Sequence, residues 1–143
     1  MSTMERIVVG GDHTPSATAA LRWAVGEAAR TGACIAVVHA FDLAGRADLA
    51  REPGLARARG EARYCIQSWV VEVIGDLNTS VPVIVSTTDA SVARALVTAS
   101  RGAVLVAIGR PHNGRNRDLA AILERACECP VVTVTSDDLV AAP

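Results

Sequence analysis

The chain is 143 residues long, has a formal net charge of -1, and is 50% hydrophobic, 20% charged and 3% aromatic. This length suits one domain over residues 1–143, large enough to fold without a disulfide or a metal. A net charge near zero creates no field that attracts nucleic acid or an acidic membrane, so we expect neither as a partner. Because aromatic side chains are scarce, the core must consist of Val, Ile, Leu and Ala, as in a parallel sheet covered by Ala-rich helices.

No targeting segment is expected. The N-terminus lacks a basic segment followed by a long apolar run, which is the pattern of a signal peptide. Apolar runs such as Ala33–Val38 and Ala103–Ile108 are far shorter than the ~20 residues that a membrane helix needs. We therefore expect a cytoplasmic protein whose four cysteines are reduced thiols.

The first part of the chain reads strand, helix, strand. Ile7–Gly10 predicts a first strand, and Thr14 can cap a helix that has Pro15 at its first position. Gly32 ends this helix, and Ala33–Phe41 predicts a second strand. Apolar residues at helical spacing form one face of the helix: Ala17, Leu21, Ala24, Val25 and Ala28.

The middle of the chain predicts a loop, a long helix and an edge strand. Asp42–Gly54 contains loop signals, and Leu55–Ile74 follows as a helix. The residues of this helix expected to face inward are Ala62, Ile66, Trp69, Val70 and Val73. Val81–Ser86 predicts a third strand, which should begin near a sheet edge because Pro82 cannot donate a ladder hydrogen bond.

The last part of the chain contains two more helix–strand units. Asp89 is expected to cap a third helix with the apolar stripe Val92, Ala95, Leu96 and Ala99. Val104–Ile108 predicts a fourth strand, followed by a polar loop. Asp118 is expected to cap a last helix with the stripe Leu119, Ile122, Leu123 and Ala126. Val131–Thr135 predicts a fifth strand, and Ser136–Pro143 a frayed tail.

The regular alternation of strands and helices indicates an α/β fold with one parallel sheet, because short crossovers of this kind are right-handed and place helices on both faces. Such sheets bind ligands beyond the carboxyl ends of their strands, where the strand order reverses. The first and fourth strands should flank that crevice. The loops that start at Gly11 and Gly109 would then overhang it.

Three segments resemble the universal stress protein family: RIVVGGDHTPSATAALRWAVGEAARTGACIAVVHAF, AVLVAIG and CPVVTV. The resemblance covers nearly the whole chain. It implies five parallel strands in the order 3-2-1-4-5, a Rossmann-like fold of the adenine nucleotide alpha hydrolase type. It also implies a homodimer that pairs through the last strand, around Val131, Val132, Thr133 and Val134.

Many members of that family bind ATP, and many others do not. In the members that bind it, the Asp of the first loop and backbone atoms at the end of the second strand hold the adenine. Those positions match Asp12 and Val38 here. The phosphates lie on a loop of the form G-x2-G-x9-G-[ST], whose first glycine matches Gly109. Glycines let the backbone N–H groups of such a loop approach the phosphates.

The phosphate loop departs from this pattern. His112 stands at the second glycine, Gly114 is out of place, and Arg117 and Asp118 occupy the places of the final Gly and Ser/Thr. A carboxylate at that site would repel phosphate by roughly 1 kcal/mol at contact in water. The loop offers three arginines as phosphate partners instead: Arg110, Arg115 and Arg117.

Several polar side chains have more than one interpretation. Asp12 either contacts a ligand or satisfies the backbone of its own turn. The three arginines form an anion site, a protein contact or a solvated loop. We expect nearby backbone to satisfy His39, whereas His13 lies in the first loop without an evident partner. No nucleophile, base and orienting group can be assembled, so no catalytic residue is assigned.

The cysteines and tryptophans are interpreted as packing residues. Cys127 and Cys129 form an isolated C-x-C pair, which is weak support for a metal or redox site. Cys129, Cys34 and Cys65 are expected to pack as small hydrophobic residues. The two tryptophans are expected to pack helix against sheet: Trp23 and Trp69.

Three functions are compatible with the sequence. The first is a non-enzymatic stress-response domain with a degenerate adenine-nucleotide cleft that holds AMP or ATP weakly. The second is an ATP-binding switch, with slow hydrolysis left open, in which Arg110, Arg115 and Arg117 replace the glycine loop. The third is a purely structural dimeric module.

Overall fold

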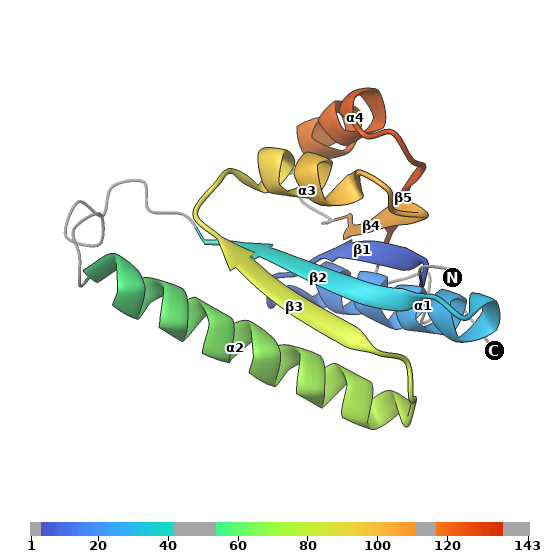
Figure 1. Ribbon diagram of the computed structural model, residues 1–143, viewed down its shortest axis with the longest axis horizontal. Coiled ribbons are helices and arrows are strands. Elements are labelled where there is room, and N and C mark those ends of the chain that lie inside the picture. Colours follow the sequence, from blue (N-terminus) through green and yellow to red (C-terminus); the bar gives the residue numbers. More distant parts are fainter. Residues whose placement is uncertain (1–3, 42–53, 111–116, 136–143) are drawn as a thin grey trace.

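The computed structural model describes residues 4–41, 54–110 and 117–135. In these ranges strands and helices alternate along the chain (Figure 1). The strands are β1 Arg6–Gly10, β2 Cys34–Ala40, β3 Val83–Thr88, β4 Leu105–Gly109 and β5 Val131–Val134. The helices are α1 Pro15–Thr31, α2 Gly54–Leu77, α3 Val92–Ser100 and α4 Arg117–Ala126. Most of the predicted loop Asp42–Gly54, and the tail from residue 136, lie outside the described residues.

The five strands form one parallel sheet in the order β3-β2-β1-β4-β5, as predicted. Gly10 of β1 is in register with Val38 of β2, and Val9 is in register with Ala107 of β4. The carboxyl ends of these three strands therefore meet at one edge of the sheet. β3 is an edge strand that begins directly after Pro82, which confirms the expectation from that proline.

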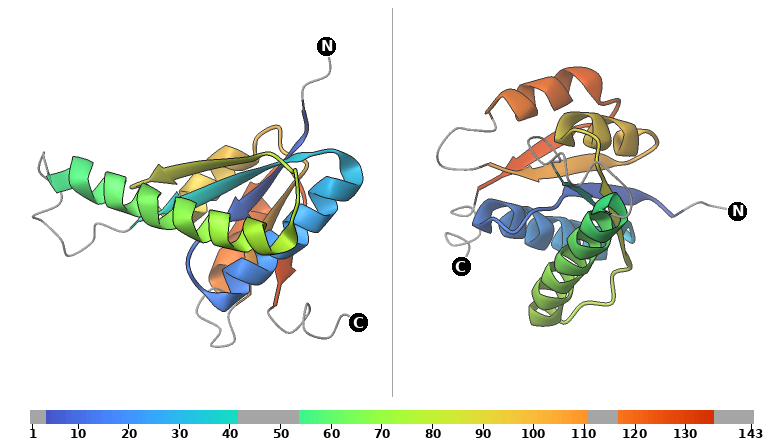
Figure 2. Two further views of the ribbon diagram at one scale, coloured as in Figure 1. Left: turned by 90° about the horizontal axis from the view of Figure 1, so that it is seen from below. Right: turned by 90° about the vertical axis from the view of Figure 1, so that its left-hand side faces the viewer.

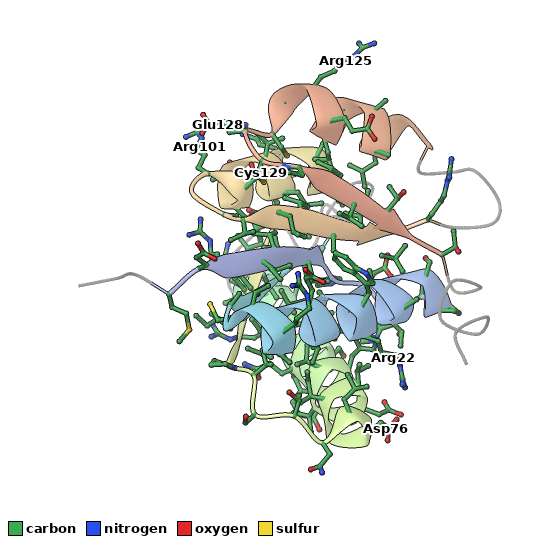
Figure 3. The ribbon with its side chains drawn as sticks, turned by 90° about the vertical axis from the view of Figure 1, so that its right-hand side faces the viewer. Arg22, Asp76, Arg101, Arg125, Glu128 and Cys129 are labelled. Carbon is green, nitrogen blue, oxygen red and sulfur yellow. The ribbon has the colours of Figure 1, made fainter. Side chains whose placement is uncertain are left out.

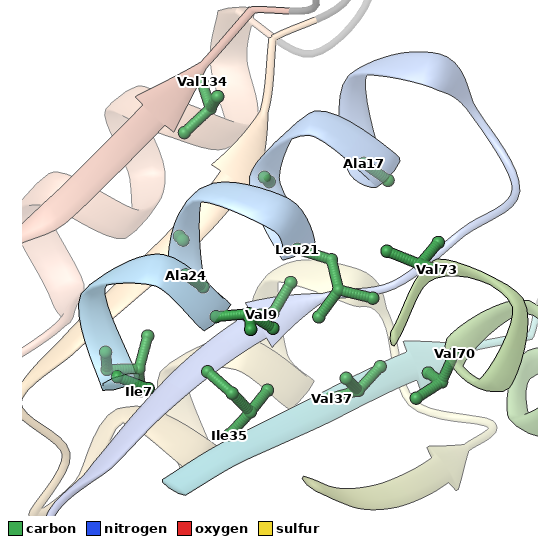
Figure 4. Close-up of a cluster of buried hydrophobic side chains, with 14 of the residues drawn as sticks. Ile7, Val9, Ala17, Leu21, Ala24, Ile35, Val37, Val70, Val73 and Val134 are labelled. Atoms are coloured by element: carbon green, nitrogen blue, oxygen red, sulfur yellow. The ribbon is translucent and has the colours of Figure 1, made fainter. Parts of the chain in front are cut away.

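The helices form one layer on each face of the sheet. α1 and α2 cover one face, and α3 and α4 cover the other (Figures 1 and 2). Successive residues of β1 alternate between these layers: Ile7 and Val9 pack with α1 and α2, whereas Val8 packs with α3 and α4. Figure 4 shows the first of these clusters, in which Leu21 and Ala24 of α1 meet the sheet.

Helix α1 has the termini that the sequence predicts. Thr14 is its N-cap and accepts a hydrogen bond from the Ala17 amide at 3.2 Å, and Pro15 is the first helical residue. Gly32 ends the helix in the left-handed region, with φ 81°, and its amide donates to the Ala28 carbonyl at 2.8 Å.

Helix α3 is capped by Ser91, so the predicted cap at Asp89 is wrong. The Ser91 hydroxyl accepts from the Arg94 amide at 3.2 Å. An N-cap must directly precede the first helical residue, and Asp89 lies too far from Val92 for that role. Its carboxylate lies instead 3.9 Å from the guanidinium of Arg59 on α2.

Helix α4 begins at Arg117, which makes Asp118 its second residue and not its N-cap, contrary to the prediction. Leu123 is fully buried, but Ile122 is 48% exposed. The helix packs against α3 and β5 at the margin of its layer. Because neighbours cover only this narrow strip, part of the predicted apolar stripe faces solvent.

Helix α2 is longer than predicted and packs by one face. Ile66, Trp69, Val70 and Val73 are buried as expected. Cys65, expected to pack inside, is exposed because it lies on the uncovered side of the helix. None of the helices in the described ranges is both long and apolar enough to cross a membrane.

Candidate functional site

A cleft of about 260 Å³ opens at the carboxyl ends of β1, β2 and β4. One side is formed by the ends of β1 and β4 and the first turn of α1: Gly10, Gly11, Asp12, Thr14, Ser16, Ala17 and Gly109. The other side is apolar and comes from β2, β4, α3 and α4: Val38, Ala40, Val92, Ala95, Leu96, Ile108 and Leu119. The strand order reverses here, since β2 and β4 both flank β1.

Gly109 lets the first turn of α1 lie directly against the end of β4. A Cβ atom at this position would lie 2.4 Å from the carbonyl carbon of Ser16 and 2.6 Å from the Ala17 nitrogen. No side chain can occupy that space, because both neighbours are backbone atoms. The glycine that we expected to serve a phosphate therefore also has a packing role in this fold.

Gly11 is fixed between β2 and the layer of α1 and α2. Its amide donates to the Val38 carbonyl at 2.9 Å, and its carbonyl lies 2.7 Å from Nδ1 of His39, which donates to it. A Cβ atom on Gly11 would lie 2.7 Å from the Val37 side chain. The expectation that nearby backbone satisfies His39 is confirmed.

Asp12 is the acidic residue of the cleft. Its Oδ1 atom accepts a hydrogen bond from the Thr14 amide at 2.9 Å and a second, short one from the Thr14 hydroxyl. These bonds are those of an Asx turn, so Asp12 has the turn role that the sequence allowed. The side chain also lines the cleft, and its contact with a ligand stays a prediction.

A chain of hydroxyl groups continues from Asp12 into α1. The Thr14 hydroxyl donates its proton to Asp12 and accepts from the Ala17 amide. Because that proton is in use, the Ser16 hydroxyl, 3.2 Å away, must donate to Thr14. This chain fixes the orientation of the Asp12 carboxylate at the mouth of the cleft.

His13 lies beside the aromatic residues of the α1–α2 layer and is not among the described residues that line the cleft. Its ring centroid is 6.2 Å from Trp69 and 6.4 Å from His39, in edge-to-face arrangements. Trp69 is anchored by its Nε1–H group, which donates to the Thr18 hydroxyl at 2.9 Å. The buried Trp69 therefore packs α2 against α1 as well as against the sheet.

The chain was compared with known protein families. The universal stress protein family matches residues 3–135, which is almost the whole chain. The chain belongs to the universal stress protein family. No match was found among curated protein sequences.

Solved universal stress proteins share its fold. One in complex with cAMP is 17% identical over 93% of this chain and 98% of its own, with a TM-score of 0.70. One from Archaeoglobus fulgidus with dAMP is 22% identical over 94% and 99%, with a TM-score of 0.64. One from Arabidopsis thaliana with AMP bound is 14% identical over 92% and 90%, with a TM-score of 0.62. At these identities the likeness establishes the α/β fold.

The residues predicted for the site are brought together in part. Gly11, Asp12, Val38 and Gly109 all line the cleft of this universal stress protein domain. Arg110 is exposed at the end of β4, and its amide donates to the Val134 carbonyl at 2.8 Å. Two of the remaining predicted residues, Gly114 and Arg115, lie outside the described residues. Arg117 is described only as the first residue of α4.

The apolar wall of the cleft was not predicted from the sequence. Val92 and Leu96 were assigned only to the packing stripe of α3, yet both line the cleft. A ligand-facing position on a helix repeats with the same spacing as a core position, so periodicity does not separate the two. The hydroxyl groups of Thr14 and Ser16 were also not predicted to line the cleft. The predicted helix start at Thr14 could have indicated them, because the helix that follows the first strand begins at the carboxyl ends of the strands.

The cysteines lie apart from the cleft. Cys34 is buried as predicted, and Cys127 and Cys129 are half-buried against the core cluster of α3 and α4. Figure 3 labels Cys129. Burial, with a smaller contribution from Cys127, raises the pKa of the Cys129 thiol. No group of three potential ligands among His, Cys, Asp and Glu comes together in the described part of the chain. These positions support packing for Cys129.

Proposed function

We propose that this protein is a non-enzymatic regulatory domain whose cleft binds an adenine nucleotide with one phosphate group, and that ATP binds it more weakly. The observation that carries the proposal is the position of the cleft at the carboxyl ends of β1 and β4, with Asp12 at its mouth. Relatives with the same fold were crystallised with cAMP, dAMP and AMP. Each of those nucleotides has a single phosphate.

The two sides of the cleft suit the two halves of a nucleoside. A purine ring is flat and apolar on its faces, and the aliphatic side chains of Val38, Val92 and Leu96 offer it a matching surface. The Asp12 carboxylate has two oxygens with about four acceptor sites. Two of these sites receive Thr14 donors, so others can accept from an adenine amine or a ribose hydroxyl.

The start of α4 disfavours a triphosphate. The N-terminus of a helix attracts anions through its free amides and its dipole. In this chain Asp118 is the second residue of α4, and we expect an acidic residue in the first turn to compete with a phosphate for that end. The repulsion is about 4 kcal/mol at contact for an effective surface dielectric of 20. Arg110, which is exposed directly after β4, would offset part of that cost.

Nucleotide binding can be tested on freshly purified protein. We expect denaturation to release AMP, and not ATP, as measured by chromatography, and titration calorimetry to show tighter binding of AMP than of ATP with Mg²⁺. Copurified ATP would support the ATP switch instead. Absence of binding by every adenine nucleotide at millimolar concentration would contradict the proposal and favour the structural module.

The role of Asp118 has its own test. We expect Asp118→Ser to improve ATP affinity by about fivefold or more, since removing one contact repulsion changes the binding free energy by about 1 kcal/mol or more. AMP affinity should change less. Glu124→Ser is the matched control, because it removes an exposed carboxylate later in the same helix. If ATP affinity does not respond to Asp118→Ser, the loop sequence and not the charge is the obstacle.

We also propose that two copies pair through β5. It is the edge strand opposite β3. The carbonyl of Pro130 accepts from Val106 of β4 and that of Val134 from Arg110 directly after it, so the backbone groups of Thr133 point to the open side. The variant Thr133→Pro removes an outward donor and leaves those β4 bonds in place. We expect it to abolish pairing through β5 in sedimentation experiments. A variant that self-associates as the parent does would exclude this pairing.

A further inference from the structure

We propose that the outer face of α2 is a second self-association surface, on which α2 of another copy packs in an antiparallel orientation. This helix forms the outer margin of its layer (Figures 1 and 2). Its outer face carries Tyr64 and Val71, which are 72% and 71% exposed. They are the most exposed of the large hydrophobic side chains in the described ranges. Two such side chains on one helix face indicate a contact surface.

The residues of this face, which we call the α2 stripe, follow the same order of residue kinds from either end, although the mirrored side chains differ in size. A glycine comes first, then a large apolar residue, two polar residues, a large apolar residue and a glycine. In order they are Gly60, Tyr64, Gln67, Ser68, Val71 and Gly75. An antiparallel copy with its two-fold axis between Gln67 and Ser68 places Tyr64 at the level of Val71 and Gly60 at the level of Gly75. Such self-complementarity is what a two-fold symmetric interface requires.

The centre of the stripe has the shape of a packing hole. Tyr64, Gln67, Ser68 and Val71 have the spacing i, i+3, i+4 and i+7, which forms the hole that receives one side chain of a facing helix. These four residues and Glu72 line a hollow of about 350 Å³. With the two-fold axis between Gln67 and Ser68, the same two side chains of the second copy face the centre of this hollow, and the Tyr64 ring of that copy packs at its edge, at the level of Val71.

Neither of the two glycines is required by a close approach inside the described part of the chain. A Cβ atom added to Gly60 or to Gly75 would meet nothing within 4 Å. Glycine inside a helix costs roughly 0.5–1 kcal/mol relative to alanine. Small residues at these two levels let a neighbouring helix approach closely, which assigns them a use outside the chain's own fold.

Charge selects a second copy in antiparallel orientation as the occupant. The first half of α2 carries Arg57, Arg59, Arg63 and Glu61, a net charge of +2, and the second half carries Glu72 and Asp76, a net charge of -2. Arg59 lies near Asp89 at 3.9 Å, and Asp76 pairs with Arg22 at 3.4 Å (Figure 3). When Arg59 and Asp76 are left out because of these pairs, the two halves of α2 still have opposite net charges of +1 and -1. An antiparallel copy brings opposite charges together at both ends, whereas a parallel copy brings like charges together.

This surface is independent of β5, so its test uses the full chain in the Thr133→Pro background. We expect sedimentation equilibrium to show a dimer, and Val71→Glu to raise its dissociation constant by about tenfold or more, because each dimer then buries two unpaired carboxylates. Ile122→Glu is the control: Ile122 is 48% exposed on α4, in the other helix layer, and its substitution should leave the dimer unchanged. A monomer before the Val71 substitution, or equal effects of the two substitutions, would overturn the proposal.

A cross-link tests the orientation without relying on a destabilising variant. Ser68→Cys in a Cys65→Ser background should form a disulfide-linked dimer under mild oxidation, since the two copies of residue 68 lie across the two-fold axis. Glu124→Cys on α4, in the same background, should not. If the cysteine at position 68 gives no more covalent dimer than the one at position 124, the antiparallel α2 pairing is wrong. Equal cross-linking to unrelated proteins in a mixture would mean a nonspecific apolar patch.

Discussion

Two glycines at the carboxyl ends of neighbouring strands shape the cleft. Gly11 is packed against Val37, and Gly109 lies against the backbone of α1. The sequence identified both positions as site residues, because a glycine after a strand in an α/β fold marks the crevice. It did not show that Gly109 faces the Ser16 backbone, since that contact joins residues far apart in the chain.

The Gly109 contact predicts a large effect from one methyl group. Gly109→Ala should lower the free energy of unfolding by about 1–3 kcal/mol. The added methyl group would overlap backbone atoms of Ser16 and Ala17, which cannot move away by a change of rotamer as a side chain could. Urea denaturation measures this change. Gly26→Ala is the control: Gly26 is exposed in α1 with open space around it, so alanine should stabilise the protein by roughly 0.5–1 kcal/mol. Equal effects of the two substitutions would contradict the close approach.

At the scale of elements, apolar runs bounded by glycine and proline were sufficient to place strands and helices. The run before Gly10 and the Thr14–Pro15 start of α1 are examples. The N-caps of α3 and α4 were less predictable, because Asp, Ser and Asn are all good N-cap residues and several stand near each helix start. Exposure of Ile122 and Cys65 was also missed, since it depends on which sides of α4 and α2 have neighbours.

The N-cap of α3 predicts different effects for two nearby residues. Ser91→Ala should lower the free energy of unfolding by about 1 kcal/mol, because the Arg94 amide loses its acceptor. Asp89→Ala should cost less than about 0.5 kcal/mol, since its ion pair with Arg59 is exposed and long. Thermal or urea unfolding of both variants gives the comparison. If Asp89→Ala lowered the free energy of unfolding more than Ser91→Ala, Asp89 and not Ser91 would be the N-cap of α3.

At the scale of the whole molecule, the two helix layers share one sheet, so the chain is expected to unfold as one unit. Both tryptophans lie in the α1–α2 layer: Trp69 is buried there, and Trp23 packs against the same cluster. Tryptophan fluorescence therefore reports on one layer, whereas circular dichroism reports on all helices. This separation makes the expectation of a single domain testable.

Substitution in the opposite layer should move both signals. Leu123→Ala removes a fully buried side chain beneath α4 and should lower the free energy of unfolding by about 2–5 kcal/mol. Leu21→Ala, in the tryptophan layer, should have a similar effect. In one cooperative domain the fluorescence and dichroism transitions coincide in both variants. If Leu123→Ala shifts the dichroism alone, the layers unfold separately.

The strand order also has a consequence for synthesis of the chain. β1 lies at the centre of the finished sheet, but its neighbour β4 is made about a hundred residues later. While the ribosome is still producing α2 and α3, β1 can pair with β2 on one side, but its other edge is open and Val8 is uncovered on one face. Chains begin to fold from the N-terminus during translation, and an open strand edge of this kind invites pairing with other chains. A nascent-chain chaperone would therefore protect this protein most before Leu105–Gly109 leaves the ribosome.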